Sequence, residues 1–488
     1  MHGTWEASRI GSAWRGILPL VLIGCLASGV LAEPERPHVI LVMADDQGWG
    51  QVGYNGHPHL KTPHLDAMAA SGIRFNRFYA AAPVCSPTRA SVLTGRLPAR
   101  TGVPGLHKRL CLQEKTLPEA LRKAGYATAH FGKWHLNGVK GSGMPILPDD
   151  PNHPGHYGFD LWLSATNYFD VDPLMSRNGQ FECLEGESSE LMVREALKFI
   201  GENRARPTFT VIWYGSPHFP FNGRPEDRQG FPEGKHGDQL GEIVALDRSV
   251  GMLRKGLRDL GIEKNTLIWY TSDNGGLSTD PDSVGGLKGF KGSLNEGGIR
   301  VPGIIEWPGR VKPAVTDFPA STMDIMPTLV DLLDLPEDSM LAVHDGESIV
   351  PLLEGAVPER RRPLPFLTKG TALIDGAFKL LSDGKGRDAK WSLFNLEEDP
   401  GETTDASADH PDRVAQMKAE VEKVVASVQA SAEGKDYPEG RVTQPQRGDS
   451  WSEMEEYRRH YDTFQKLKPG WEPPQTKRKS GKRDSDGE

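Results

Sequence analysis

The chain has 488 residues, of which 37% are hydrophobic and 25% charged, an ordinary composition for a globular protein of two or three domains. Its formal net charge of -9 excludes a general electrostatic attraction to nucleic acid or anionic lipid. We therefore expect no nucleic-acid partner. A protein of this charge that acts on an anionic substrate needs a local cluster of cationic side chains to bind it.

Residues 1–32 are typical of an export signal. Arg9 and Arg15 flank an apolar stretch from Ile17 to Ala32, and small residues favour cleavage after Ala32. A membrane span needs about 20 apolar residues, so we expect no transmembrane segment here or later in the chain. These features predict a periplasmic or extracellular protein. The residues before Cys25 also resemble a bacterial lipoprotein box, which leaves a lipid anchor at Cys25 open.

The cysteines are too few for a disulfide framework to define the fold. Four occur, namely Cys25, Cys85, Cys111 and Cys183. Whether Cys111 and Cys183 pair in an oxidising compartment is left open by the sequence.

From residue 38 onward, short β-rich runs alternate with longer stretches of helical periodicity. The runs predict strands at His38–Ala44, Ala127–Phe131, Thr208–Tyr214, Thr266–Ser272 and Gly303–Trp307. The helical periodicity predicts helices at His64–Ser71, Leu117–Ala124, Glu190–Glu202, Gly241–Leu260 and Asp324–Leu335. This alternation is typical of βαβ units, so we predict an α/β fold with a mixed, mostly parallel sheet flanked by helices.

A run of arginine and proline near Pro358 predicts a boundary between a catalytic domain at 36–357 and a smaller domain at 358–433. In the smaller domain, Leu373–Ser382 and Lys390–Leu396 are expected as hairpin strands, and Arg413–Ala430 as a helix. These elements predict an α+β domain with an antiparallel sheet.

Residues 434–488 form a C-terminal extension. Ser450 and Glu453 match a capping box, which predicts a helix over 451–467. After Gln475 the chain is basic, small and polar, and we expect that end to be disordered.

Polar side chains gather directly after the predicted strands. In open α/β sheets, ligands bind beyond the carboxyl ends of the strands, so these positions predict a site. They are Asp45 and Asp46, Lys133 and His135, His218, and Asp273 and Asn274.

The carboxylates of Asp45, Asp46 and Asp273 and the amide oxygen of Asn274 form an all-oxygen set of hard ligands. Such a set favours calcium, with magnesium second, over zinc. An aspartate after a strand is often only a turn former. The pairing of two acidic strand ends is what favours a metal site here.

The segment Cys85-Ser86-Pro87-Thr88-Arg89 continues into Leu93-Thr94-Gly95-Arg96 and resembles the signature of the sulfatase family. A buried structural cysteine would explain Cys85 but not Arg89. Further segments resemble this family in the same order, namely Val42 to Gly50, Thr62 to Asp66, Gly132 to His135, Ser216 to His218, Ser272 to Gly275, and Lys291 to Arg300. The similarity is greatest to the branch of arylsulfatase A and N-acetylgalactosamine-6-sulfatase.

The resemblance implies an alkaline-phosphatase-like fold and hydrolysis of sulfuric esters. It implies that a formylglycine-generating enzyme oxidises Cys85 to formylglycine during export, and that the side chain at position 85 also binds the metal. The hydrated aldehyde would offer one hydroxyl as nucleophile and use the second to expel sulfate. A serine or an unmodified cysteine lacks that second hydroxyl.

The resemblance also implies roles for the cationic and imidazole side chains. Arg89, Lys133 and Lys291 would bind the sulfate oxygens. His135 would help to deprotonate or orient the hydrated aldehyde. His218 would protonate the leaving oxygen, with Lys291 beside it.

The expected substrate is a sulfated carbohydrate, with the sulfated sugar at the end of a glycan chain. Loops at 53–61, 105–109 and 167–172 are candidates for sugar contacts, and a 6-O-sulfated galactose or N-acetylgalactosamine is the first candidate. Two other functions stay open, a phosphodiesterase or phosphonate monoester hydrolase of the same superfold, and a catalytically silent sulfoglycan-binding protein. Asp273 and Asn274 argue against the two-zinc site of many phosphodiesterases, and an intact Cys85 and Arg89 argue against a silent protein.

Overall fold

The computed structural model describes residues 1–5, 36–384, 389–442 and 448–473. The described residues from Arg36 onward belong to one compact unit. The predicted cleavage site, Cys25 and the basic C-terminal end lie outside the described residues. Within the described ranges, no helix is long and apolar enough to cross a membrane.

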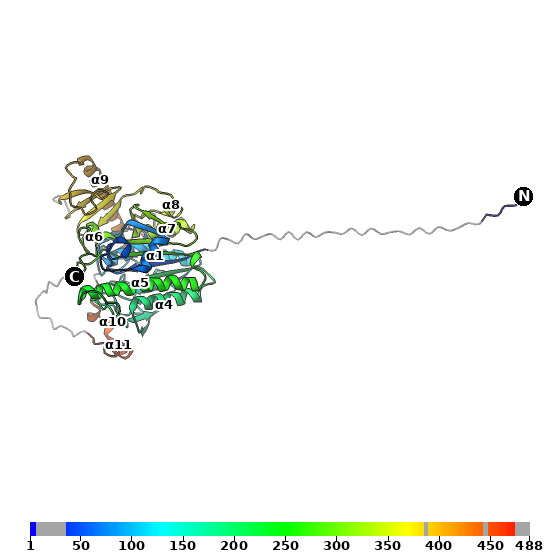
Figure 1. Cartoon of the computed structure of the whole chain (residues 1–488), viewed down its shortest axis with the longest axis horizontal. Coiled ribbons are helices and arrows are strands. Elements are labelled where there is room, and N and C mark those ends of the chain that lie inside the picture. The colour runs from blue at the N-terminus through cyan, green and yellow to red at the C-terminus, as the bar shows by residue number, and fades with distance from the viewer. Residues whose placement is uncertain (6–35, 385–388, 443–447, 474–488) are drawn as a thin grey trace. The chain divides into compact units, whose positions relative to one another are not determined.

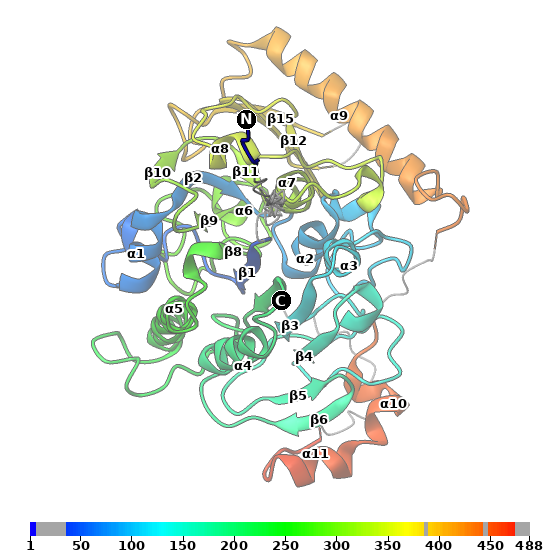
Figure 2. The ribbon, with the colours of Figure 1, turned by 90° about the vertical axis from the view of Figure 1, so that its right-hand side faces the viewer.

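The main sheet has eleven strands in the order β10-β2-β9-β8-β1-β7-β3-β4-β5-β6, with β11 also beside β2 (Figure 2). The strands from β8 to β4 are mutually parallel, whereas β9 runs antiparallel between β8 and β2. The prediction of a mixed, mostly parallel sheet is confirmed. The strands are β1 His38–Ala44, β2 Ile73–Tyr79, β3 Ala127–Lys133, β4 Leu161–Ala165, β5 Leu174–Arg177, β6 Gln180–Cys183, β7 Thr208–Trp213, β8 Thr266–Ser272, β9 Arg300–Glu306, β10 Ala314–Thr316 and β11 Ala320–Ser321.

Helices cover both faces of this sheet, which explains why β1 is apolar along its whole length. Val39, Leu41 and Met43 pack with α2 and α7, while Ile40 and Val42 pack with α1, α4 and α5 on the other face. Figure 1 shows α4 and α5 side by side. The helices are α1 Pro63–Ser71, α2 Cys85–Thr94, α3 Leu117–Lys123, α4 Ser188–Glu202, α5 Lys235–Asp259, α6 Glu296–Ile299, α7 Ile325–Leu332 and α8 Val350–Leu353.

Some predicted elements end elsewhere, and some strands were not predicted. The helix α5 begins at Lys235, before the predicted Gly241, and β9 begins at Arg300, before the predicted Gly303. Strands β2, β4, β5, β6, β10 and β11 had no prediction. Several of these are short edge strands, whose pairing depends on neighbours that are distant in sequence.

A second, antiparallel sheet follows, in the order β12-β13-β14-β15. The predicted single strand at Leu373–Ser382 is wrong, because the chain turns at Gly376, with a φ of 61°, and forms two strands of a hairpin. Glycine adopts this left-handed conformation without strain. The elements are β12 Leu364–Leu367, β13 Thr371–Asp375, β14 Phe378–Ser382, β15 Trp391–Asn395 and α9 Pro411–Ala432, which packs on β13 and β14.

The C-terminal extension lies beside β5 and β6 (Figure 2). The single helix predicted over 451–467 is wrong, since the chain forms a 3₁₀ turn at Trp451–Glu453 and two short helices, α10 Glu455–Arg458 and α11 Tyr461–Leu467. Ser450 makes no side-chain capping bond. The break lets Trp451, Tyr457 and Phe464 all reach one apolar cluster. Cys111 and Cys183 are not joined by a disulfide.

Candidate active site

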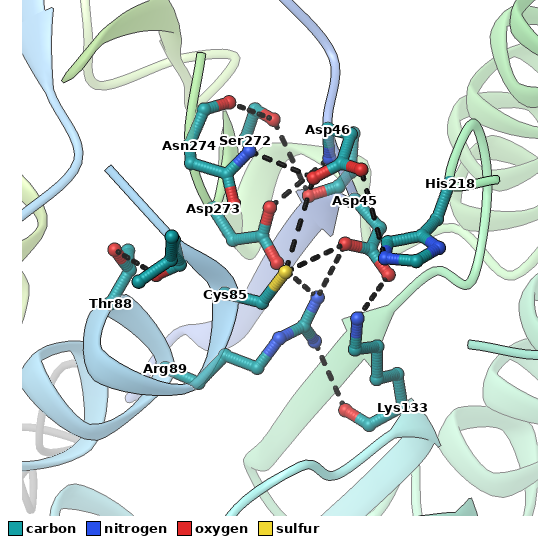
Figure 3. A network of polar contacts seen from close by, with 12 residues as sticks. Asp45, Asp46, Cys85, Thr88, Arg89, Lys133, His218, Ser272, Asp273 and Asn274 are labelled. Atoms are coloured by element: carbon teal, nitrogen blue, oxygen red, sulfur yellow. Dashed lines mark hydrogen bonds and ion pairs between the residues drawn. The ribbon is translucent and has the colours of Figure 1, made fainter. Parts of the chain in front are cut away.

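The candidate site lies at the edge of the main sheet where β1, β3 and β8 end (Figure 3). Asp45 and Asp46 follow β1 and Asp273 follows β8, so the parallel pairing of these strands brings three carboxylates together. Asp46 has a φ of 70°, a conformation that costs a non-glycine residue about 1 kcal/mol or more. Its backbone N–H donates to Asp273 Oδ1 over 3.1 Å, which stabilises that conformation.

Cys85 is the first residue of α2, a helix whose residues are all buried. Pro87 lies in the first turn, where its missing N–H leaves no helical hydrogen bond unmade. Cys85 Sγ lies 3.5 Å from Asp45 Oδ1 and 3.9 Å from Asp46 Oδ1. The helix therefore holds the predicted nucleophile position against two of the predicted metal ligands (Figure 3).

Arg89 lies one helical turn after Cys85 and is fully buried. Its Nη2 is 2.6 Å from Asp273 Oδ2, and its Nη1 donates to the carbonyl oxygen of Lys133 over 3.0 Å. The guanidinium also lies over the ring of Trp213, 5.2 Å from its centroid. These contacts fix a planar cation beside position 85.

Two lysines complete the cationic set. Lys133 Nζ is 2.6 Å from Asp45 Oδ2, and Lys291 Nζ is 2.9 Å from Asp46 Oδ2. Lys133 is fully buried, whereas Lys291 keeps a side-chain exposure of 20% and lies at the open side of the site.

The two predicted histidines lie at this edge of the sheet, each in contact with a residue from a rim loop. His218 Nε2 is 3.8 Å from Asp46 Oδ2, and its ring stacks on Tyr168 at 4.5 Å. Its Nδ1 donates to the carbonyl oxygen of Phe219, so Nε2 carries the lone pair in the neutral ring. His135 Nε2 lies 3.2 Å from His107 Nδ1.

Burial keeps the thiol and both imidazoles neutral in this arrangement. It raises the pKa of the Cys85 thiol well above its usual value, so the thiol is protonated at pH 7. Burial, reinforced by Lys133, lowers the pKa of His135 well below its usual value and that of His218 to about 3. The surroundings of Cys85 therefore do not favour a thiolate nucleophile.

The carboxylates respond to different neighbours. Burial favours the neutral form of Asp46, but Lys291 and His218 hold its pKa below the usual range. Burial and the nearby charge of Asp45 raise the pKa of Asp273 to about 6, although Arg89 opposes the shift. This crowding of carboxylates is the electrostatic condition under which a bound cation is stabilising.

The donor set fits a divalent cation. Ligand atoms of Asp45, Asp46, Cys85 and His218 lie within 4.8 Å of one another. Asn274 Oδ1 is buried and receives no hydrogen bond from the residues that the structure describes, while its Nδ2 donates to Asp46 Oδ1 over 2.8 Å. A buried amide oxygen without a partner is costly unless a cation or donor meets it.

Some features of the site carry no sequence signal. His218 is expected from the sequence only on the leaving-group side, whereas its Nε2 also lies near the carboxylates. Tyr168 and Trp213, which contact His218 and Arg89, belong to no motif. Tyr168 lies within a loop predicted for sugar contacts, but nothing in its spacing marks it as a partner of His218.

Known proteins resemble this chain in sequence and in fold. A family model described as Sulfatase matches residues 37–335. N-acetylgalactosamine-6-sulfatase from Mus musculus is 34% identical, over 73% of this chain and 73% of its own. Arylsulfatase A from Homo sapiens is 35% identical, over 74% of this chain and 76% of its own.

Among solved structures, the protein described as Ps i-CgsB in complex with k-i-k-neocarrahexaose superposes with a TM-score of 0.71 and 28% identity, covering 80% of this chain and 92% of its own. The phosphonate monoester hydrolase of Agrobacterium radiobacter, with a TM-score of 0.59 and 21% identity over 80% of this chain and 96% of its own, shares the fold. The fold and site are those of an alkaline-phosphatase-like hydrolase of sulfuric esters. The chain belongs to the sulfatase family, whose members generally use a formylglycine and a divalent metal.

Proposed function

We propose that this protein releases inorganic sulfate from a sulfated carbohydrate, acting at the end of a glycan chain. One observation carries the proposal, namely that Cys85 Sγ lies 3.5 Å from Asp45 Oδ1, within a cluster of carboxylates that are paired with three cations. The cations are Arg89, Lys133 and Lys291. A nucleophile position, a cation site and three fixed positive charges are what an anionic ester requires.

The proposed cofactors are a formylglycine derived from Cys85 and one calcium ion, with magnesium as second choice. Asp45, Asp46, Asp273 and Asn274 would hold the cation together with the side chain at position 85. The cation would neutralise the sulfate oxygens as a Lewis acid, and the hydrated aldehyde would supply the nucleophilic hydroxyl. The partner needed for maturation is a formylglycine-generating enzyme.

The cationic side chains bind and orient the sulfate group. Arg89 and Lys133 are fully buried, so they direct charge at the sulfur substituents without competition from water. Their pairing with Asp273 and Asp45 fixes both cations before the substrate arrives, which reduces reorganisation during the reaction.

The two site histidines have different proposed roles, proton transfer for His218 and orientation of the side chain at position 85 for His135. His218 Nδ1–H donates a hydrogen bond to the carbonyl oxygen of Phe219, so Nε2 is the atom that would take up the proton released by the attacking hydroxyl and pass it to the leaving oxygen. Lys291, at the open side of the site, supplies positive charge to the same oxygen. His135 lies deeper, against His107, and orients the side chain at position 85.

The substrate class follows from the relatives and the rim loops. Similar proteins are named for N-acetylgalactosamine 6-sulfate, and one similar structure holds a neocarrahexaose. A 6-O-sulfated galactose or N-acetylgalactosamine at a chain end is therefore our first candidate. We also propose that the chain is exported to the periplasm or the cell exterior, with a lipid anchor at Cys25 as the alternative to cleavage after Ala32.

The deciding experiment is a screen of defined sulfated oligosaccharides with free and with blocked ends, alongside a nitrophenyl sulfate and the matching phosphodiester. Sulfate release from chains with free ends, and a much lower rate on the phosphodiester, is the expected result. Fast release from the interior of end-blocked chains would contradict the exo-acting proposal. Preference for the phosphodiester would contradict the sulfatase proposal.

A further inference from the structure

Residues 448–471 of the C-terminal extension run as a strap over loops at the rim of the site. Its aromatic side chains Trp451, Tyr457 and Phe464 are buried in a cluster with residues of β5 and the 138–147 segment. Tyr457 Oη also donates to the carbonyl oxygen of Pro145 over 3.1 Å. Burial of large aromatic side chains is favourable because it removes apolar surface from water. The strap is therefore a packed element of the structure.

One end of the strap reaches the loop that contacts His135. The backbone N–H of Gly448 donates to the carbonyl oxygen of His107 over 3.0 Å. The contact is so close that a Cβ on Gly448 would lie 1.8 Å from the carbonyl oxygen of Gly138. On its other side, His107 Nδ1 lies 3.2 Å from His135 Nε2. The strap thus fixes the backbone of a residue that contacts a site histidine.

The middle of the strap contacts the 138–147 segment, which in turn contacts Asn167, the residue before Tyr168. The backbone N–H of Trp451 donates to the carbonyl oxygen of Lys140 over 3.1 Å, and its indole packs on Gly141. The carbonyl oxygen of Gly141 accepts the side-chain amide of Asn167 over 2.7 Å.

The far end of the strap contacts the 167–172 loop, which contains Tyr168. Lys468 Nζ donates to the carbonyl oxygen of Asp172 over 2.7 Å and lies 3.5 Å from that of Val171. Tyr168 lies between Asn167, which contacts Gly141, and Asp172, which contacts Lys468. Its ring stacks on His218 at an interplanar angle of 12°. Both site histidines are therefore flanked by rim residues whose loops the strap restrains.

We propose that the strap is a specificity element, and that Trp451 and Lys468 are positioning residues for the rim loops 105–109 and 167–172. The inference rests on the proposed function. Cys85, Arg89 and the carboxylates are held by α2 and the sheet, so the strap acts on the part of the pocket beyond the sulfate group. A long sulfated sugar contacts that rim, whereas a small aryl sulfate is held mainly by the sulfate-binding residues.

The test compares Lys468→Met with the matched control Lys466→Met, whose side chain is exposed two residues earlier. Loss of the Lys468 hydrogen bonds should raise the KM for a sulfated oligosaccharide by about tenfold, which corresponds to about 1.4 kcal/mol of lost loop ordering. In Lys468→Met, the kcat for the oligosaccharide and the kcat/KM for nitrophenyl sulfate should both stay within about twofold of the wild-type values. Lys466→Met should behave as the wild type does.

A second pair of variants, Trp451→Ala and Trp451→Phe, tests the middle of the strap with the same two substrates. Trp451→Ala should raise the KM for the oligosaccharide, and Trp451→Phe should raise it less because the phenyl ring keeps part of the packing. Hydrogen exchange in loops 105–109 and 167–172 should quicken in Lys468→Met and Trp451→Ala. Unchanged exchange, or an equal loss on both substrates, would overturn the strap proposal. A wild-type protein that hydrolyses neither sulfate would overturn the proposed function instead, because the exchange result is independent of turnover.

Discussion

Arg89 Nη2 lies 2.6 Å from Asp273 Oδ2, and neither side chain is exposed to solvent. Two further cations of the site are also paired with carboxylates, since Lys133 pairs with Asp45 and Lys291 with Asp46. Three cations and three carboxylates leave these residues formally neutral. A divalent cation makes the site positive, so an anionic ester becomes the group that restores the balance.

Arg89→Met should remove activity and stability together. The variant loses one of the donors directed at sulfate, which should reduce kcat by about 10²-fold to 10³-fold. It also leaves Asp273 buried without its partner, which should cost about 3–5 kcal/mol of unfolding free energy. Steady-state kinetics and urea unfolding measure the two effects. A variant as stable as the wild type would show that the buried pair is not what holds Asp273.

Cys85→Ala should remove turnover while keeping the fold. We expect a loss of about 10⁴-fold or more, because no other side chain at the site can supply the nucleophile. Mass spectrometry of the wild-type peptide around Cys85 should show the thiol replaced by an aldehyde. Full activity in a preparation that carries only the thiol would contradict the proposed formylglycine.

Removal of the metal with a chelator should abolish activity, and calcium should restore it better than magnesium. Asp45→Asn should weaken metal binding, and it should also destabilise the metal-free protein, because it leaves the buried Lys133 ammonium without its carboxylate partner. Elemental analysis and activity after metal addition test this assignment. Stoichiometric zinc in active protein would refute it.

Asp247 predicts a pH-dependent stability that is separate from catalysis. Its Oδ1 accepts the backbone N–H groups of His64 and Leu65 at the start of α1, and burial raises its pKa to about 6. A carboxyl with a raised pKa in the folded state destabilises the fold as pH rises from about 4 through about 6, by roughly 2–3 kcal/mol. Asp247→Asn, which keeps one acceptor oxygen, should gain stability relative to the wild type at pH 8 but not at pH 4.

Urea unfolding of both proteins at the two pH values measures this difference. An offset between Asp247→Asn and wild type that is the same at pH 4 and pH 8 would show that ionisation of Asp247 is not its cause.

Lys379 joins the second sheet to α6, the short helix that follows the loop carrying Lys291. Its Nζ lies 3.0 Å from Glu296 Oε1 and 2.9 Å from Glu402 Oε1, and all three side chains are fully buried. Lys379→Met should therefore cost about 3–5 kcal/mol of unfolding free energy, because two buried carboxylates lose their shared cation.

The control is Lys423→Met, which removes an exposed ion pair with Glu420 on α9 and should change stability by less than about 0.5 kcal/mol. Urea unfolding of the two variants separates the effects. Equal stability of both would contradict a structural role for the buried cluster.

Much of the site was predictable because its residues follow strand ends in a parallel sheet. Asp45, Asp46 and Asp273 lie together because β1 and β8 pair in parallel, and carboxyl ends of parallel strands meet at one edge. Cys85 and Arg89 lie together because one helical turn separates them. The first of these contacts follows from the parallel order of the strands, and the second follows from helical spacing in the local sequence.

Other features could not be predicted, because they depend on contacts between segments far apart in the chain. Gly376 divides a predicted strand into a hairpin, since pairing with neighbouring strands decides the conformation of the segment. The extension folds as a strap because Phe464 packs on Phe181 of β6 and Trp451 packs on Gly141, not along one face of a single helix.

The sequence by itself determined the family, the sheet and the identity of the chemical groups, through short motifs and the period of its apolar residues. Only the tertiary structure decided that Asp273 faces Arg89, that His218 Nε2 approaches the carboxylates, and that His107 contacts His135. Side-chain direction in a site depends on burial and on hydrogen bonds to residues that no local pattern specifies.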